Sequence, residues 1–227
     1  MTKQEYQEIL DQKLESGYEI DIRATIMDAL RYFRMEPLQF FGYTSFLIFL
    51  SLLTIRFQPV GTIVNIFILP ILTAGYFYAA AKMDRGEKLS FHDFFQGFNS
   101  WLNIFIGATL AGLITFLGFI LFIVPGIYLV VSYSFLYPFM VNAKFEYWEA
   151  MEASRKLITK NFWDILGFIL ALILLNILGI LLFGIGVLIT LPVTYLSIYS
   201  AFKNILPESE STSDKNNSSK IDFSIFR

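Results

Sequence analysis

Residues 94–143 read FFQGFNSWLNIFIGATLAGLITFLGFILFIVPGIYLVVSYSFLYPFMVNA and contain no Asp, Glu, Lys or Arg. Two other stretches are similar, since residues 165–202 also contain no charged residue and residues 37–81 contain only Arg56. A helix needs roughly 20 apolar residues to cross the hydrocarbon core of a bilayer, which is about 30 Å thick. Each stretch is long enough for two such helices, so the sequence predicts three helical hairpins in a membrane.

Helix-breaking residues divide each stretch into two helices. The turns are predicted at three pairs of residues: Pro59 with Gly61, Pro125 with Gly126, and Gly184 with Gly186. The six predicted membrane-spanning helices then cover residues 38–56, 61–82, 101–124, 126–143, 163–183 and 187–203. The predicted fold is therefore an all-α polytopic membrane protein.

The positions of the basic residues predict the orientation of these helices. Of the 17 lysines and arginines, only Arg56 falls in one of the three turns on the outer side. Basic residues accumulate on the cytoplasmic side of membrane proteins. We therefore expect both termini to be cytoplasmic and the three outer turns to be short.

A shorter amphipathic segment precedes each hairpin. These segments are residues 21–34, residues 90–98, where Ser90 and Asp93 form a predicted capping box, and residues 146–160, where Trp148, Met151 and Leu157 are assigned to one side. An apolar stripe with mixed charges suits the headgroup boundary of a membrane, but it can equally pack on protein. Both alternatives remain open at this point.

The chain divides into three predicted parts. Residues 1–36 form cytoplasmic amphipathic helices, including a short helix at residues 6–14 that ends near Gly17. Residues 37–203 form the six-helix transmembrane domain. Residues 204–227, rich in Ser, Asn and Glu, are predicted to be a disordered cytoplasmic tail.

The three units of amphipathic helix and hairpin form a predicted internal repeat. Glycines and prolines occupy corresponding positions in the three hairpins: Gly42, Gly107 and Gly167 in the odd helices, and Pro70, Pro138 and Pro192 in the even ones. Repeats of this kind can build a central axis with a ligand site, as in transporters. They can also reflect duplication of a stable folding unit.

The residue types present argue against most kinds of catalysis. The chain has no cysteine and only one histidine, His92, which excludes thiol chemistry and disfavours a histidine-based metal centre. No carboxylate lies inside a predicted span, whereas proton-driven transport and hydrolysis need buried titratable groups. The charged residues around the second cytoplasmic segment, Asp84, Arg85, Glu87, His92 and Asp93, are interpreted as a capped and solvated loop. We expect no enzyme activity, catalytic residue, metal or cofactor.

Four residues are candidates for contact with a lipid or substrate. They are Arg56 at the outer face and the intramembrane asparagines Asn65, Asn103 and Asn176. An asparagine in a span can coordinate a headgroup, but it can also form an interhelical hydrogen bond. The Arg56 side chain can bind a lipid phosphate, or it can extend to the outer headgroups and end the first span.

Two segments carry a resemblance to a known family. Residues 123–138 read IVPGIYLVVSYSFLYP and residues 149–163 read EAMEASRKLITKNFW. Together with Gly75 and the upstream segments 85–87 and 91–95, they resemble a broad family of bacterial integral membrane proteins of unknown function. That family includes the DUF975 family, the YciC-like proteins and the membrane domain attached to some glycerophosphodiester phosphodiesterases. The resemblance implies a bacterial inner-membrane location but no particular activity, because nothing here resembles the soluble phosphodiesterase barrel.

The sequence thus predicts a non-catalytic bacterial inner-membrane protein concerned with membrane lipid organisation or envelope integrity. Its expected partners are membrane lipids, with a second copy of the chain or a cytoplasmic protein as further candidates, and nucleic acid is not expected. One alternative is a transporter or translocator of a lipid or small molecule, with a site at the repeat interface. The other is an accessory membrane subunit for a lipid-metabolising enzyme.

Overall fold

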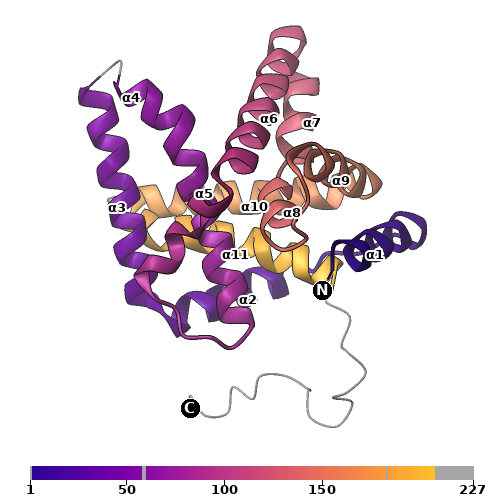
Figure 1. Cartoon of the computed structure of the whole chain (residues 1–227), viewed down its shortest axis with the longest axis horizontal. Coiled ribbons are helices and arrows are strands. Elements are labelled where there is room, and N and C mark those ends of the chain that lie inside the picture. Colours follow the sequence, from indigo (N-terminus) through magenta and orange to yellow (C-terminus); the bar gives the residue numbers. More distant parts are fainter. Residues whose placement is uncertain (1, 58–59, 183, 208–227) are drawn as a thin grey trace.

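The computed structural model describes residues 2–57, 60–182 and 184–207, and this part of the chain is helical without any strand (Figure 1). The predicted tail from residue 208 onward lies outside the described residues. The elements are α1 (Lys3–Ser16), α2 (Ile22–Met35), α3 (Pro37–Arg56), α4 (Val60–Ile63), the π-helical η1 (Val64–Ile68), α5 (Leu69–Asp84), the 3-10 helix η2 (Phe91–Ser100), α6 (Trp101–Leu121), α7 (Ile123–Ser132), α8 (Leu136–Val141), α9 (Tyr147–Lys160), α10 (Phe162–Leu181) and α11 (Val187–Ile205).

Five helical segments of the described chain are long and apolar enough to cross a membrane. They are Pro37–Arg56, Gly61–Asp84, Phe91–Leu121, Ile123–Val141 and Phe162–Leu181. The predicted sixth span forms a helix, α11, which contains Thr, Ser and Lys residues and is not among these five segments. The membrane class of the protein is therefore supported, whereas the count of six spans is not confirmed.

The turn of the second hairpin differs from the prediction. Phe122 is extended, with φ −160° and ψ 156°, and α7 begins directly after it at Ile123. Pro125 and Gly126 therefore lie inside α7 and do not form the turn. Proline is tolerated in the first turn of a helix, because the N–H group that it lacks would have no helical partner there.

The fourth predicted span, residues 126–143, is not one continuous helix. It breaks at Tyr133–Phe135 into α7 and α8. Pro138 explains the position of the break, because its ring would clash with the carbonyl group of Ser134 in a continuous helix. The hydroxyl group of Ser154 on α9 stabilises the break, since it donates to the carbonyl group of Ser132 at 2.6 Å and accepts from the backbone N–H of Phe135 at 3.2 Å.

The predicted internal repeat is not confirmed by local structure. Pro70 follows the π-helical segment η1, Pro138 follows the break between α7 and α8, and Pro192 lies within the continuous helix α11. The hairpins also differ in direction, because α10 runs across Figure 1 behind α5 whereas α6 and α7 rise from the body. The three units therefore share an order of elements but not one packing arrangement.

The amphipathic segments pack on protein. Helix α2 lies along α11 and buries Thr25, Ala29 and Phe33. Helix α9 buries Met151 and Leu157, but Trp148 is 62% exposed, so the prediction that these three residues share one side was wrong. Trp148 and Leu157 are about two and a half helical turns apart, which places them on opposite faces of the helix.

Two glycines allow the backbones of α5 and η2 to touch. A Cβ atom on Gly75 would lie 2.1 Å from the carbonyl oxygen of Phe94, and one on Gly97 would lie 2.6 Å from that of Ile71. Neither neighbour is a flexible side chain that could move away. This contact holds η2 against the middle of α5, where Phe94 stacks on Tyr43 with ring centroids 4.3 Å apart.

We predict that Gly75→Ala destabilises the protein by about 1–3 kcal/mol, the usual range for overpacking, because α5 and η2 must separate. Thermal unfolding in detergent, followed by tryptophan fluorescence, measures this change. Gly112→Ala is the matched control, since nothing lies within 4 Å of a Cβ atom at that position in α6. An equal loss of stability in both variants would contradict the close contact at Gly75.

Candidate functional site

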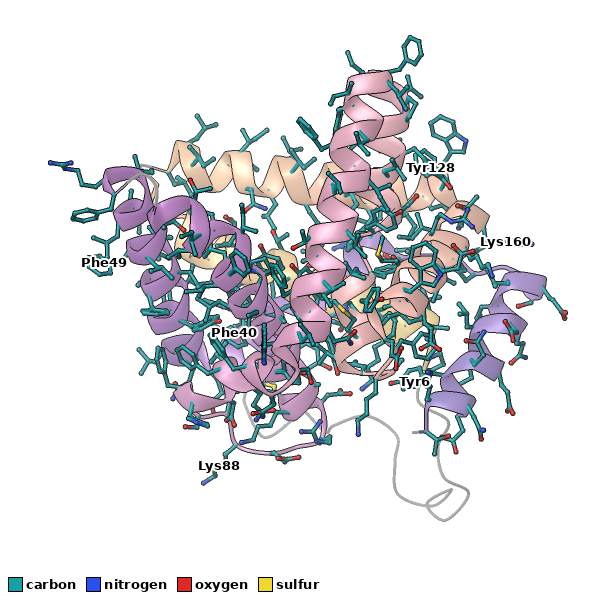
Figure 2. All side chains as sticks on the ribbon, turned by 45° about the horizontal axis from the view of Figure 1, so that its top comes forward. Tyr6, Phe40, Phe49, Lys88, Tyr128 and Lys160 are labelled. Atoms are coloured by element: carbon teal, nitrogen blue, oxygen red, sulfur yellow. The ribbon has the colours of Figure 1, made fainter. Side chains whose placement is uncertain are left out.

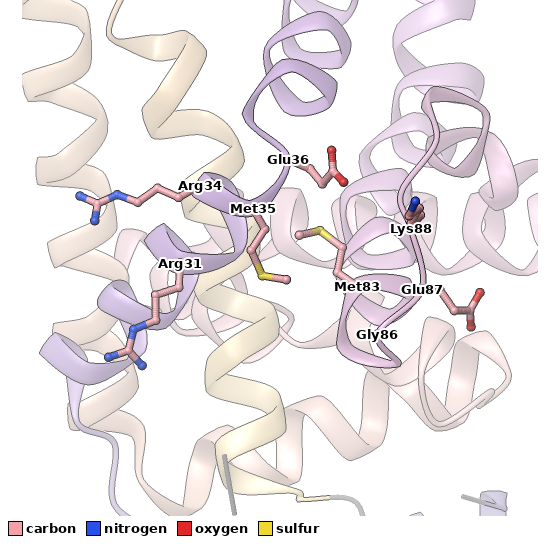
Figure 3. Close-up of a pocket in the computed structure, with 8 residues that line it drawn as sticks. All are labelled: Arg31, Arg34, Met35, Glu36, Met83, Gly86, Glu87 and Lys88. Atoms are coloured by element: carbon pink, nitrogen blue, oxygen red, sulfur yellow. The ribbon is translucent and has the colours of Figure 1, made fainter. Parts of the chain in front are cut away.

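A pocket of about 530 Å³ opens at the end of the first hairpin where α5 terminates (Figure 3). We call it the charged pocket. The residues that line it are Arg31, Arg34, Met35, Glu36, Met83, Gly86, Glu87 and Lys88. They come from the C-terminal end of α2, the junction of α2 with α3, the end of α5 and the loop after α5.

Local sequence explains why these residues meet. Helix α2 stops at Met35, and Glu36 with φ −137° turns the chain so that Pro37 begins α3. The residue before a proline avoids the helical conformation, which accounts for this sharp junction. On the opposite wall, α5 ends at Asp84 and Gly86 reverses the chain with φ +71°, a left-handed conformation that favours glycine.

The pocket contains charged groups that no described residue neutralises. Within the described ranges, Arg34, Glu36 and Lys88 have no ion-pair partner. In contrast, Arg31 pairs with Asp28 at 3.0 Å, and Glu87 accepts from Arg85 at 2.6 Å. The pocket therefore presents unpaired charges of both signs to whatever occupies it.

The floor between these charges is apolar. Figure 3 shows the side chains of Met35 and Met83 pointing toward one another, with Arg31 and Arg34 to one side and Glu87 and Lys88 to the other. Met83 is almost fully buried, with 2% of its surface exposed. Unbranched thioether side chains adapt to irregular apolar ligands, so this floor suits a flexible hydrocarbon group.

A buried carboxylate fixes the elements around the pocket. Asp84, whose side chain is 8% exposed, accepts hydrogen bonds from Tyr32 at 2.8 Å and from Tyr199 at 3.4 Å, and forms an ion pair with Lys203. These partners lie on α2 and α11, so one carboxylate joins three helices. Burial of the phenol and the negative charge of Asp84 raise the pKa of Tyr32 well above its usual range. The Tyr32 hydroxyl group therefore remains a hydrogen-bond donor.

A second buried carboxylate joins η2 to α5. Both oxygens of Asp93 accept from Lys82 at 2.8 Å, and they also accept from the backbone N–H of Ser90 at 2.6 Å and from Gln96 at 3.0 Å. The predicted capping box of Ser90 and Asp93 is present. The interpretation of a capped and solvated loop therefore holds for the cap but was wrong for Asp84 and Asp93, because each of these side chains is only 8% exposed and has structural partners.

The four residues predicted to contact lipid or substrate do not gather in one place. Asn65 donates to Thr54 at 3.3 Å between η1 and α3, and Asn176 donates to Thr194 at 2.6 Å between α10 and α11. Asn103 on α6 donates to the carbonyl group of Phe145 at 3.0 Å and accepts from the N–H of Tyr147 at 2.6 Å. Arg56 is exposed at the end of α3, with its guanidinium group 6.0 Å from the ring of Phe57. The asparagines therefore join separate pairs of elements.

Sequence reasoning did not find the charged pocket. A signal was present, because short charged runs at residues 34–36 and 85–88 flank the two ends of the first predicted hairpin. In a hairpin the first helix begins on the same side of the membrane on which the second helix ends, so these two runs must lie near each other. Among the described residues, no group of His, Asp and Glu side chains could hold a metal ion.

Comparison with models of known protein families, with curated proteins and with solved structures finds no match to this chain. The resemblance to the bacterial membrane family in residues 123–163 therefore stays a prediction, and the function has to be argued from the structure itself.

We predict that Lys203→Met destabilises the protein by about 1–3 kcal/mol, because it leaves the buried Asp84 carboxylate with only two tyrosine donors. Thermal unfolding in detergent measures the loss. Lys88→Met is the control, since Lys88 is exposed (Figure 2) and has no ion-pair partner among the described residues. Equal stability of the two variants would show that the Asp84 pair does not hold α5 to α11.

Proposed function

We propose that this chain is a non-catalytic integral membrane protein that binds phospholipid headgroups in the charged pocket and takes part in membrane lipid organisation or envelope integrity. The observation that carries the proposal is the combination of unpaired Arg34, Glu36 and Lys88 with an apolar floor. A phosphate is a strong acceptor for arginine and lysine.

The position of the pocket supports a lipid as its occupant. Glu36 directly precedes α3, a candidate span, and Asp84 ends another candidate span. Leu38, in the first turn of α3, is 83% exposed, so an apolar surface continues from the pocket along the span. A headgroup in the pocket would leave its acyl chains beside α3, where hydrocarbon is expected.

We further propose that the protein resides in a bacterial inner membrane with both termini cytoplasmic. The distribution of lysine and arginine supports this orientation, since 16 of the 17 basic residues lie outside the outer turns and Arg56 is the exception. The charged pocket would then face the cytoplasmic leaflet, together with α1, α2 and the loop after α5.

The alternative of a transporter or translocator has less support than lipid binding. Such a protein needs polar groups that converge on one path, and the three asparagines bond to different elements. The alternative of an accessory subunit for a lipid-metabolising enzyme is compatible with the same headgroup pocket. It differs from the proposed role only in that the protein would also bind an enzyme.

The orientation can be tested by labelling single cysteines, because the chain contains no native cysteine. We predict that a membrane-impermeant maleimide labels Arg56→Cys on intact spheroplasts, whereas it labels Gln12→Cys only after the membrane is permeabilised. Labelling of Gln12→Cys on intact cells would contradict a cytoplasmic N-terminus.

Native mass spectrometry of the protein with added phospholipid tests the pocket. We predict that Arg34→Ala and Lys88→Ala each reduce bound lipid about two- to fivefold, the range expected for a partly exposed charge pair. Arg23→Ala is the matched control, since Arg23 is an exposed arginine of α2 outside the pocket. If Arg56→Ala or Asn176→Leu releases the lipid and Arg34→Ala does not, the pocket is not the binding site.

A further inference from the structure

We infer that the charged pocket selects phospholipids whose headgroup carries both a phosphate and a primary ammonium group, the chemistry of phosphatidylethanolamine. This inference rests on the proposed function, because it names the class of lipid that the same pocket would take. The acidic residues of the pocket indicate this class, because the binding of a phosphate alone leaves them unexplained.

A pocket for a phosphate alone would not place carboxylates on its wall. Glu36 lines the pocket without an ion-pair partner in the described part of the chain, and the ion-pair partner of Glu87 is Arg85, which is exposed. Two carboxylates so close to an anionic headgroup would repel it and weaken binding. They favour binding only when the headgroup also brings a cation.

Charged residues lie on both sides of the methionine pair, as a headgroup with two oppositely charged ends would require. Arg31 and Arg34 project from α2, while Glu87 belongs to the loop after α5 on the opposite side of the methionine pair (Figure 3). Glu36 lies at the start of α3, where the candidate span begins. A zwitterion can therefore be neutralised at both ends, whereas a headgroup with an uncharged glycerol would leave the glutamates facing a neutral group.

The type of cation follows from the kind of residues in the pocket. A primary ammonium group offers three N–H donors, and carboxylate oxygens are acceptors only. A quaternary ammonium group has no N–H donor and is recognised by the faces of aromatic rings. None of the eight described lining residues is aromatic. The pocket is therefore suited to ethanolamine and not to choline.

The walls of the pocket are positioned before any ligand arrives. Met83 immediately precedes Asp84, whose carboxylate is held by Tyr32 and Lys203, and Tyr32 lies between the pocket residues Arg31 and Arg34 on α2. The two walls are thus joined by a part-buried hydrogen bond between residues adjacent in sequence to those that line the pocket. Groups held in place by the protein bind a ligand with a smaller loss of conformational entropy.

The test is native mass spectrometry of detergent-purified protein with an equimolar mixture of phosphatidylethanolamine, phosphatidylcholine and phosphatidylglycerol that share the same acyl chains. We expect phosphatidylethanolamine to exceed each of the other two in the bound fraction by about two- to fivefold. The double variant Glu36→Gln with Glu87→Gln should remove this preference while total bound lipid persists. Glu8→Gln with Glu15→Gln, two exposed glutamates of α1, is the matched control.

The outcomes separate the two proposals. The selectivity inference is wrong if the three lipids bind equally, or if the double glutamine variant keeps the preference for phosphatidylethanolamine. Headgroup binding would still be supported in that case if Arg34→Ala reduces the binding of all three lipids. If Arg34→Ala changes no lipid, headgroup binding in this pocket fails. A parallel experiment adds soluble glycerophosphoethanolamine at the same concentration as the lipid. If this compound displaces the bound lipid, the pocket binds the free zwitterion, and the inference that its ligand is a membrane lipid is wrong.

Discussion

The packing of the described chain around the first hairpin depends on how one buried negative charge is compensated. Asp84 ends a candidate span, and its carboxylate would cost several kcal/mol to bury without partners. Tyr32, Tyr199 and Lys203 supply those partners from α2 and α11. Because the three donors come from segments before and after α5 in the sequence, satisfying one charge brings distant parts of the chain together and positions the charged pocket beside them.

A related constraint applies to the backbone. In an apolar environment every interrupted helix needs partners for the N–H and C=O groups that it frees. The break between α7 and α8 meets this need through Ser154 of α9, which bonds to Ser132 and to Phe135. The start of α9 is held in a similar way by Asn103 of α6, through Phe145 and Tyr147. Helix α9 is therefore a structural partner of the second hairpin and not a separate surface helix.

These contacts also give a structural role to the polar residues inside the hairpins. Asn65, Asn103 and Asn176 stand out in a sequence because their neighbours are apolar, and an isolated polar residue suggests a ligand site. In the structure each has a protein partner within hydrogen-bonding distance. Arg34, Glu36 and Lys88, for which the described part of the chain provides no ion-pair partner, lie in ordinary charged runs at helix ends and attract no notice in the sequence.

The sequence by itself determined the helical class, the apolar segments able to span a membrane, the third turn and the capped start of η2. These features follow from local properties: the absence of charge over about 20 residues, helix-breaking residues and side chains that cap a helix. Only the tertiary structure decided the break at Tyr133–Phe135, the close contact at Gly75 and the meeting of residues 34–36 with residues 85–88. Those features depend on which helix faces which, and that choice is set by packing and by the compensation of buried charge between residues far apart in the chain.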